Sequence, residues 1–170
     1  MIESGDFENA YSRSSNNYIL DQATQTRTFD IKPWKIESGN IKIISNSYGR
    51  PRSGITFIDL SGSTPGSISQ TFTVIAGLLY TLSFYSAVNP NSQTQSVRVI
   101  TPSKTQDFEI SGTSNWWLLD WKLFTIDFYS TTASATIIFQ SLTGNGPLLD
   151  EVLVNPTGLI YLSLIIIPPG

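Results

Sequence analysis

The stretch from Ser114 to Trp121 reads SNWWLLDW and places three tryptophans within eight residues. Trp116 and Trp117 are adjacent in it, directly after Gly, Thr, Ser and Asn, which are residues typical of loops. A tryptophan exposed on a loop stacks on a sugar ring or anchors a protein interface. The alternative is that one of the two packs down over the end of the domain. Trp116 and Trp117 are therefore the first candidate ligand-binding residues.

Side chains for acid–base and nucleophilic catalysis are scarce in this chain. It contains no histidine and no cysteine, which excludes Ser-His-Asp and Cys-His arrangements, disulfides and thiolate metal sites. A glycosidase needs two carboxylates that face each other across a cleft. The spacing singles out no such pair among the available acids, which are Asp59, Asp107, Glu109 and Asp127. The sequence therefore predicts that the protein is not an enzyme.

The charge distribution bears on the partner. The net charge of −3 argues against nucleic acid, whose affinity for proteins depends on many basic residues. Six of the ten basic residues nonetheless lie between positions 27 and 52, where only Asp30 and Glu37 oppose them. An anionic partner and a solvated loop face are both consistent with this cluster, which consists of Arg27, Lys32, Lys35, Lys42, Arg50 and Arg52.

The elements that must position these residues are β-strands. Apolar residues make up 40% of the chain and charged residues only 14%, and no run of apolar residues has helical spacing. Alternating runs separated by Gly, Pro, Asn and Ser predict an all-β sandwich of antiparallel strands. The expected strands are Ile2–Glu8, Lys35–Glu37, Ile41–Ser45, Thr56–Leu60, Ser67–Thr73, Leu79–Ala87, Ser96–Thr101, Asp107–Ile110, Lys122–Phe128, Thr136–Leu142 and Leu149–Val154.

The alternation also assigns the faces of these strands. Tyr85 and Tyr129 fall on polar faces, which makes them further candidates for ligand contact. Two stretches lack the alternation. The stretch Asn9–Lys32 is rich in Ser, Asn, Gln and Thr, and predicts a long excursion between the first two strands. The stretch Asn89–Gln95 predicts an exposed hairpin loop.

The C-terminal run Gly158–Ile167, GLIYLSLIII, is apolar but has about half of the ~20 residues of a membrane helix, so no membrane span is expected. Its β-branched residues favour a strand that either pairs with another chain or adds to the parent sheet. We predict a domain at 1–156 and a docking tail at 157–170. The partner-docking residues would be Leu159, Ile160, Tyr161, Leu162, Leu164, Ile165, Ile166 and Ile167.

Seven short motifs occur in a characteristic order. They are SGDFE from Ser4, PWKIESGNIKII from Pro33, IDLSG with GSISQTF from Ile58, AGLLYTLSF from Ala76, DWKLFTIDF from Asp120, IIFQSL from Ile137 and GPLLDEVLV from Gly146. This succession resembles the choice-of-anchor C family of bacterial surface proteins and their relatives among plant cell-wall proteins. Ser4 stands where the family pattern has Asn. The resemblance implies a galactose-binding-like jelly roll, usually non-catalytic and associated in the plant relatives with cell-wall polysaccharide.

The resemblance also implies roles for single residues. Glu8 and Asp150 would lie close together, where related carbohydrate-binding modules hold a structural calcium ion. Calcium takes about six to eight oxygen ligands, so backbone carbonyls would have to complete its shell. The alternative is that both carboxylates accept hydrogen bonds from backbone N–H groups. Trp34 and Trp121 occupy motif positions and are expected in the core.

Two classes of function follow. The first is a non-catalytic module that recognises surface or cell-wall glycans, located outside the cell after removal of a signal sequence. The second is a structural subunit of a larger assembly, such as a virus capsid or a surface layer, docked through the apolar tail. It is favoured by the lack of a signal sequence at Met1 and places the protein in a virion or other particle. Neither function requires a cofactor beyond the calcium described above.

Overall fold

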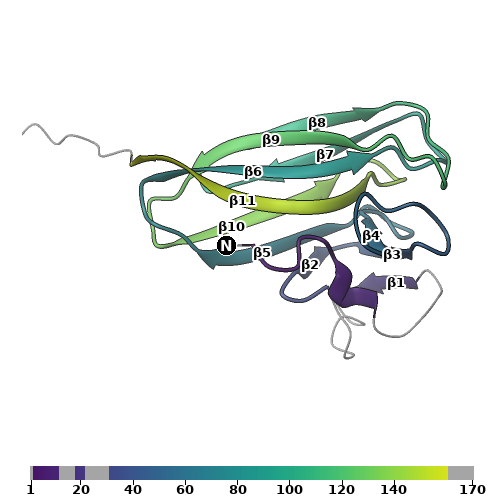
Figure 1. The fold of residues 1–170 in the computed structure, drawn as a ribbon, viewed down its shortest axis with the longest axis horizontal. Coiled ribbons are helices and arrows are strands. Elements are labelled where there is room, and N and C mark those ends of the chain that lie inside the picture. The colour runs from purple at the N-terminus through teal and green to yellow at the C-terminus, as the bar shows by residue number, and fades with distance from the viewer. Residues whose placement is uncertain (1, 12–17, 22–30, 161–170) are drawn as a thin grey trace, which may run out of the picture.

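The computed structural model describes residues 2–11, 18–21 and 31–160, which form two antiparallel sheets packed face to face (Figure 1). The six-stranded sheet has the order β1-β3-β4-β11-β6-β9, and the five-stranded sheet has the order β2-β5-β10-β7-β8. This architecture confirms the predicted all-β jelly-roll sandwich. The elements are η1 (Glu8–Tyr11), β1 (Tyr18–Asp21), β2 (Lys35–Ser38), β3 (Asn40–Ser45), β4 (Thr56–Asp59), β5 (Ser67–Thr73), β6 (Leu78–Ala87), β7 (Thr94–Ile100), β8 (Thr105–Ser111), β9 (Lys122–Tyr129), β10 (Ser134–Ser141) and β11 (Leu148–Ile160).

The main core lies between the two sheets and follows from the alternation of the strands. In β6, Leu82 and Phe84 are fully buried, whereas Tyr85 on the opposite face is partly exposed. Phe84 contacts Phe139 of β10 across the interface, with ring centroids 5.1 Å apart. Trp34 is fully buried and packs against Phe139 as well, as expected for a core tryptophan. Burial of these large rings removes much apolar surface from water and holds the sheets together.

The predicted strand Ile2–Glu8 is wrong. Ser4 and Phe7 have positive φ values of 50° and 55°, which an extended strand does not allow, and Glu8 begins a short 3-10 helix. The segment is nonetheless fixed to the sandwich, because Val152 of β11 donates a backbone hydrogen bond to the Gly5 carbonyl at 2.9 Å. The segment therefore contacts β11 without extending a sheet.

The prediction for Asn89–Gln95 is correct in part. The middle of the loop is exposed, but the loop is not a hairpin, because β6 and β7 lie in different sheets, and both of its end residues are buried. The Gln95 side chain accepts a hydrogen bond from the Asn89 backbone N–H at 2.7 Å and donates to the Gly146 carbonyl at 2.8 Å. The Asn89 side chain donates to Asp59 Oδ2 at 2.8 Å. These amides satisfy buried polar groups of neighbouring loops, a role that a polar composition does not reveal.

The predicted boundary at residue 156 falls inside a strand. β11 runs antiparallel to β6 as far as the pair Ile160 and Leu78, so residues 157–160 continue the parent sheet. Residues 161–170 lie outside the described residues, and so do the docking residues predicted from Tyr161 to Ile167. Across the described part of the chain, no helix is long and apolar enough to cross a membrane.

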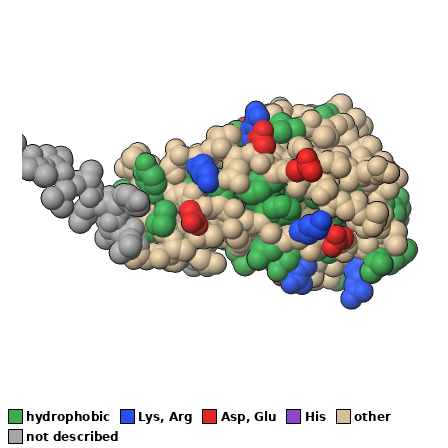
Figure 2. Space-filling model, turned by 90° about the horizontal axis from the view of Figure 1, so that it is seen from above, with side chains coloured by type: hydrophobic (Ala, Val, Ile, Leu, Met, Phe, Trp, Pro, Cys, Tyr) green, Lys and Arg blue, Asp and Glu red, His purple; other side chains and the backbone are tan. Residues whose placement is uncertain are grey.

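The strands β8 and β9 are the last strands of their sheets and lie on the same side of the sandwich. The inward-facing rings of Phe108 and Phe124 pack between them, with centroids 5.5 Å apart, and both are only partly buried. Figure 2 looks onto this side and shows hydrophobic atoms along its middle among scattered acidic and basic side chains. The charges on these edge strands oppose pairing with another sheet.

Four loops gather at the end of the sandwich where β11 begins, on the right of Figure 1. They are residues 46–55, 88–93, 112–121 and 142–147, and we call this region the loop end. Backbone hydrogen bonds join neighbouring loops. Arg50 N–H donates to the Trp116 carbonyl at 2.7 Å. The loop end therefore forms one connected surface that carries most of the aromatic candidates.

Candidate functional site

The two adjacent tryptophans occupy the middle of a tight turn between Asn115 and Leu118. Leu118 N–H donates to the Asn115 carbonyl at 2.9 Å, and Trp117 N–H donates to Asn115 Oδ1 at 2.9 Å. Asn is favoured at such positions because its side chain bonds the backbone two residues on. The turn separates the two indoles. Trp116 is partly buried, whereas 61% of Trp117 is exposed.

Trp116 packs onto the sandwich end. It meets the Tyr48 ring edge-on, with centroids 4.8 Å apart. Gly49 lies directly beneath it, since a Cβ atom there would be 3.1 Å from the Trp116 ring. Trp116 also covers a small apolar cluster that is separate from the main core and consists of Ile44, Phe57, Ala87 and Leu148. Of the two tryptophans, Trp116 therefore holds the turn in place and Trp117 faces solvent.

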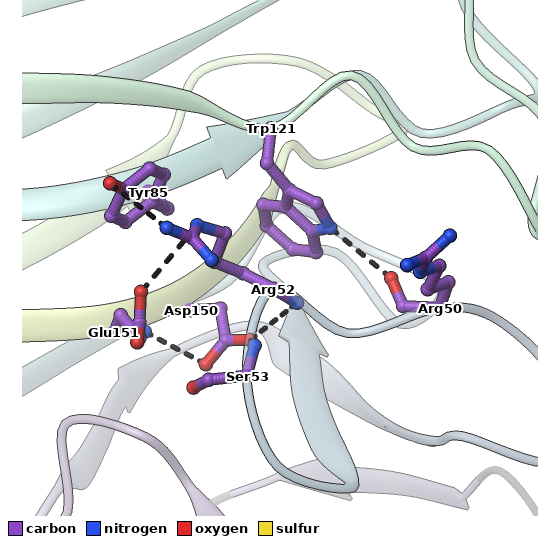
Figure 3. A network of polar contacts seen from close by, with 7 residues as sticks. All are labelled: Arg50, Arg52, Ser53, Tyr85, Trp121, Asp150 and Glu151. Carbon is purple, nitrogen blue, oxygen red and sulfur yellow. Dashed lines mark hydrogen bonds and ion pairs between the residues drawn. The ribbon is translucent and has the colours of Figure 1, made fainter.

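Trp121 ties the same turn to the loop that carries the arginines. Its indole N–H donates to the Arg50 carbonyl at 3.1 Å, and its ring meets Phe57 edge-on at 5.6 Å (Figure 3). The ring is partly buried and packs on the small apolar cluster. The expectation that Trp121 lies in the core is confirmed in part: it is partly buried against the small apolar cluster and not between the two sheets, because its place before β9 sets it over the sandwich end.

Arg52 covers the face of Tyr85. The guanidinium carbon lies 4.3 Å from the ring centroid, and Nη2 donates to the Tyr85 hydroxyl at 3.2 Å (Figure 3). Arg52 Nε is also 3.6 Å from Glu151 Oε2. Glu151 sits in an irregularity of β11, with a φ of 49°, where the register with β6 shifts. The sequence did not predict that Arg52, Tyr85 and Glu151 contact one another, although Arg52 belongs to the basic cluster between positions 27 and 52.

Asp150 is fully buried and holds the arginine loop from below. Its Oδ2 accepts hydrogen bonds from the backbone N–H groups of Arg52 at 2.9 Å and Ser53 at 3.2 Å, and its Oδ1 accepts one from Glu151 N–H at 2.8 Å. Burial raises the pKa of Asp150 to about 7, and these three N–H donors act in the opposite direction. Asp150 therefore fixes the backbone that presents Arg52.

Glu8 binds the other end of the same loop. Its Oε1 accepts hydrogen bonds from the backbone N–H groups of Ile55 and Thr56, each at 2.9 Å. Glu8 and Asp150 thus both accept backbone hydrogen bonds from one continuous segment, residues 52–56. This agrees with the alternative to calcium binding, in which both carboxylates bind backbone N–H groups. Within the described ranges, no group of three or more His, Cys, Asp or Glu side chains is placed to hold a metal. Calcium binding at Glu8 and Asp150 stays a prediction.

Tyr129 lies apart from the loop end. It is 40% exposed and pairs with Leu79, at the opposite end of β9 from the tryptophans. Three of the four carboxylates considered for catalysis are engaged in other contacts. Asp107 forms an ion pair with Arg98 at 2.7 Å, Asp127 accepts a hydrogen bond from Thr81, and the buried Asp59 accepts one from Asn89, whereas Glu109 is exposed on β8.

A family model described as "Protein of unknown function (DUF642)" matches residues 1–155 of the chain. The chain is also 31% identical over 161 residues to Halomucin of Haloquadratum walsbyi (strain DSM 16790 / HBSQ001). That match covers 91% of this chain but only 2% of Halomucin, so the chain spans a small part of that relative's length. The matching family is a domain of unknown function, and the choice-of-anchor C assignment stays a prediction.

The fold is similar to that of carbohydrate-binding modules. A family 35 module from an environmental isolate has a TM-score of 0.55 at 19% identity, covering 71% of this chain and 85% of that one. TmCBM61, solved in complex with β-1,4-galactotriose, has a TM-score of 0.54 at 20% identity, covering 84% and 99%. A family 35 module of Paenibacillus barcinonensis has a TM-score of 0.52 at 12% identity, covering 82% and 98%. At these identities the likeness shows the fold alone.

Proposed function

The chain belongs to the DUF642 family, and we propose that it is a non-catalytic module that binds glycans at its loop end. The glycan would be one of a cell surface or cell wall, and the module would act outside the cell. On this proposal the chain is a surface module of the choice-of-anchor C type. Three of the similar folds are named as carbohydrate-binding modules, which supports this class of function.

One observation carries the proposal, namely the exposed indole of Trp117 on a turn that is held from both sides. Asn115 bonds its backbone, and Trp116 anchors the turn on Tyr48. An aromatic ring presented by a rigid turn loses little conformational freedom on binding, and it offers a flat apolar face to a sugar ring. Leu118 is 68% exposed beside it and extends the apolar surface.

The two tyrosine candidates, Tyr85 and Tyr129, contribute less to the proposed site than Trp117 does. Tyr85 is covered by Arg52 on one face, so it contributes its edge and hydroxyl rather than a stacking surface. Tyr129 lies at the opposite end of β9 and would belong to a separate contact. Asp107 and Asp127 are bonded to Arg98 and Thr81, and Asp59 is buried, which supports a function without catalysis, since glycoside hydrolysis needs two facing carboxylates.

The alternative of an assembly subunit gains no support from the proteins compared above. Its main argument was the apolar tail. Residues 157–160 of that tail continue the parent sheet, and the rest lies outside the described residues. None of the similar proteins reported above is named as a capsid or surface-layer subunit. We therefore retain glycan binding as the proposed function.

Affinity gel electrophoresis against a panel of neutral and acidic polysaccharides tests the proposal. We expect at least one polysaccharide to retard the wild-type chain and Trp117→Ala to lose that retardation. Tyr129→Ala is the matched control, because it removes an exposed aromatic side chain at the opposite end of the sandwich. The proposal fails if no polysaccharide retards the wild type, or if Trp117→Ala is retarded as strongly.

A further inference from the structure

Arg50 is an arginine whose charge is not neutralised within the described part of the chain. The other two arginines there form ion pairs, Arg52 with Glu151 at 3.6 Å and Arg98 with Asp107 at 2.7 Å. Within the described residues, the exposed side chain of Arg50 makes no hydrogen bond or ion pair, and Figure 3 shows Trp121 between Arg50 and Arg52. Its N–H donors are therefore free to bind a ligand.

The backbone of Arg50 is fixed beside the turn that presents Trp117. Its N–H donates to the Trp116 carbonyl at 2.7 Å, and its carbonyl accepts the Trp121 indole N–H at 3.1 Å. The residue is thus bound on both sides to the tryptophan loop. A ligand that stacks on Trp117 would therefore lie on the loop next to the one that carries Arg50.

Further positive charge lies on the same surface. Lys42 Nζ is 5.4 Å from the centroid of the Tyr48 ring, which in turn packs against Trp116. Two nearby acids pair with other cations, Glu151 with Arg52 and Asp120 with Lys122 at 3.5 Å. Neither of these two acids therefore neutralises Arg50.

We propose that the glycan bound at Trp117 carries an anionic group, a carboxylate or a sulfate, and that Arg50 binds this group. The inference rests on the proposed function and names its ligand class. A guanidinium presents a planar fork of N–H donors that matches two oxygens of either anion, and such charge-assisted pairs are stronger than neutral hydrogen bonds. A neutral sugar would engage Trp117 but leave Arg50 in water.

The test compares polysaccharides that share a backbone and differ in charge. Polygalacturonate is paired with its methyl ester for carboxylates, and dextran sulfate is paired with dextran for sulfates. We expect one anionic member to bind at least about tenfold more tightly than its neutral partner, as one charge-assisted pair provides. Arg50→Gln should abolish this difference and leave binding of the neutral member unchanged.

Lys104→Gln is the matched control, because it removes one exposed positive charge from the turn between β7 and β8, at the other end of the sandwich. If Arg50→Gln and Lys104→Gln lost the same amount of affinity for the anionic polysaccharide, the binding would reflect general charge attraction, and the inference would be overturned. Equal binding of neutral and anionic members would also overturn it, while leaving glycan binding intact. If no polysaccharide binds at all, the proposed function itself fails.

Discussion

The guanidinium of Arg52 lies flat over Tyr85, with its central carbon 4.3 Å from the ring centroid and its Nη2 bonded to the hydroxyl. This contact closes one face of a tyrosine that the strand pattern alone assigns to an open polar surface. Asp150 holds the contact in place from below through the Arg52 backbone N–H. At the loop end, aromatic side chains are exposed at Trp117, by 61%, and at Tyr48, by 44%.

We predict that Arg52→Ala uncovers Tyr85. Nitration of Tyr85 by tetranitromethane, followed by mass spectrometry, should be faster in the variant than in the wild type, because the covering guanidinium is gone. Tyr129 is the internal control, since it lies at the far end of β9 and its rate should not change. Equal nitration of Tyr85 in both proteins would show that Arg52 does not cover the ring in solution.

We predict that the two tryptophans differ in their contribution to stability. Trp116→Ala should lower the free energy of unfolding by about 2 kcal/mol, because the ring packs against Tyr48 and the small apolar cluster. Trp117→Ala should change it by less than about 0.5 kcal/mol, because most of its ring is already in water. Urea denaturation followed by circular dichroism gives both values, and similar losses for the two variants would refute the assignment.

We predict that Asp59 makes the protein less stable as pH rises from about 4 to about 7. Burial raises the pKa of Asp59 from 3.8 to about 7, against the opposing effects of the Ser61 N–H, Lys42 and Asn89. The folded protein therefore holds a proton that the unfolded chain releases above pH 3.8, and stability falls through this window.

The loss of unfolding free energy that Asp59 causes between about pH 4 and about pH 7 is on the order of a few kcal/mol. Asp150 acts in the same direction, since its pKa is also raised to about 7, so the comparison must isolate one residue. Asp59→Asn serves this purpose. Its unfolding free energy, measured by urea denaturation across the pH range, should vary less steeply than that of the wild type. Parallel curves for the two proteins would contradict the prediction.

The hydrogen-bond interpretation of Glu8 and Asp150 predicts that excess EDTA leaves the melting temperature unchanged, because both carboxylates already bind backbone N–H groups of residues 52–56. Glu8→Gln should lower the free energy of unfolding by about 1–2 kcal/mol, since a neutral amide oxygen accepts these hydrogen bonds more weakly than a carboxylate. A lower melting temperature in EDTA that calcium restores would instead establish the calcium interpretation.

The sandwich could be predicted because its strands alternate between core and solvent. In β9, Ile126 and Phe128 are buried while Thr125 and Asp127 are exposed, and the predicted strand ends within one residue of the observed one. The segment before η1 could not be predicted, because its conformation depends on positive φ values and on contact with β11. Neither feature leaves a periodic signal in the residues.

The candidate site was predictable in part. Residue type identified Trp116 and Trp117, but only the turn geometry decides that the first packs and the second is exposed. The basic cluster around Arg50 was visible in the sequence, whereas the pairing of Arg52 with Tyr85 and Glu151 was not. These partners lie far apart along the chain, and side-chain contacts over such separations have no local pattern.

Glycan contact at Trp117 can be observed directly from the indole N–H signals of an isotope-labelled sample. The chain has four tryptophans and therefore four such signals, and Trp117→Ala identifies the relevant one. On titration with an acidic oligosaccharide, we expect the Trp117 signal to shift and that of the buried Trp34 to stay. Binding that leaves the Trp117 signal unmoved would place the glycan elsewhere and contradict the proposed site.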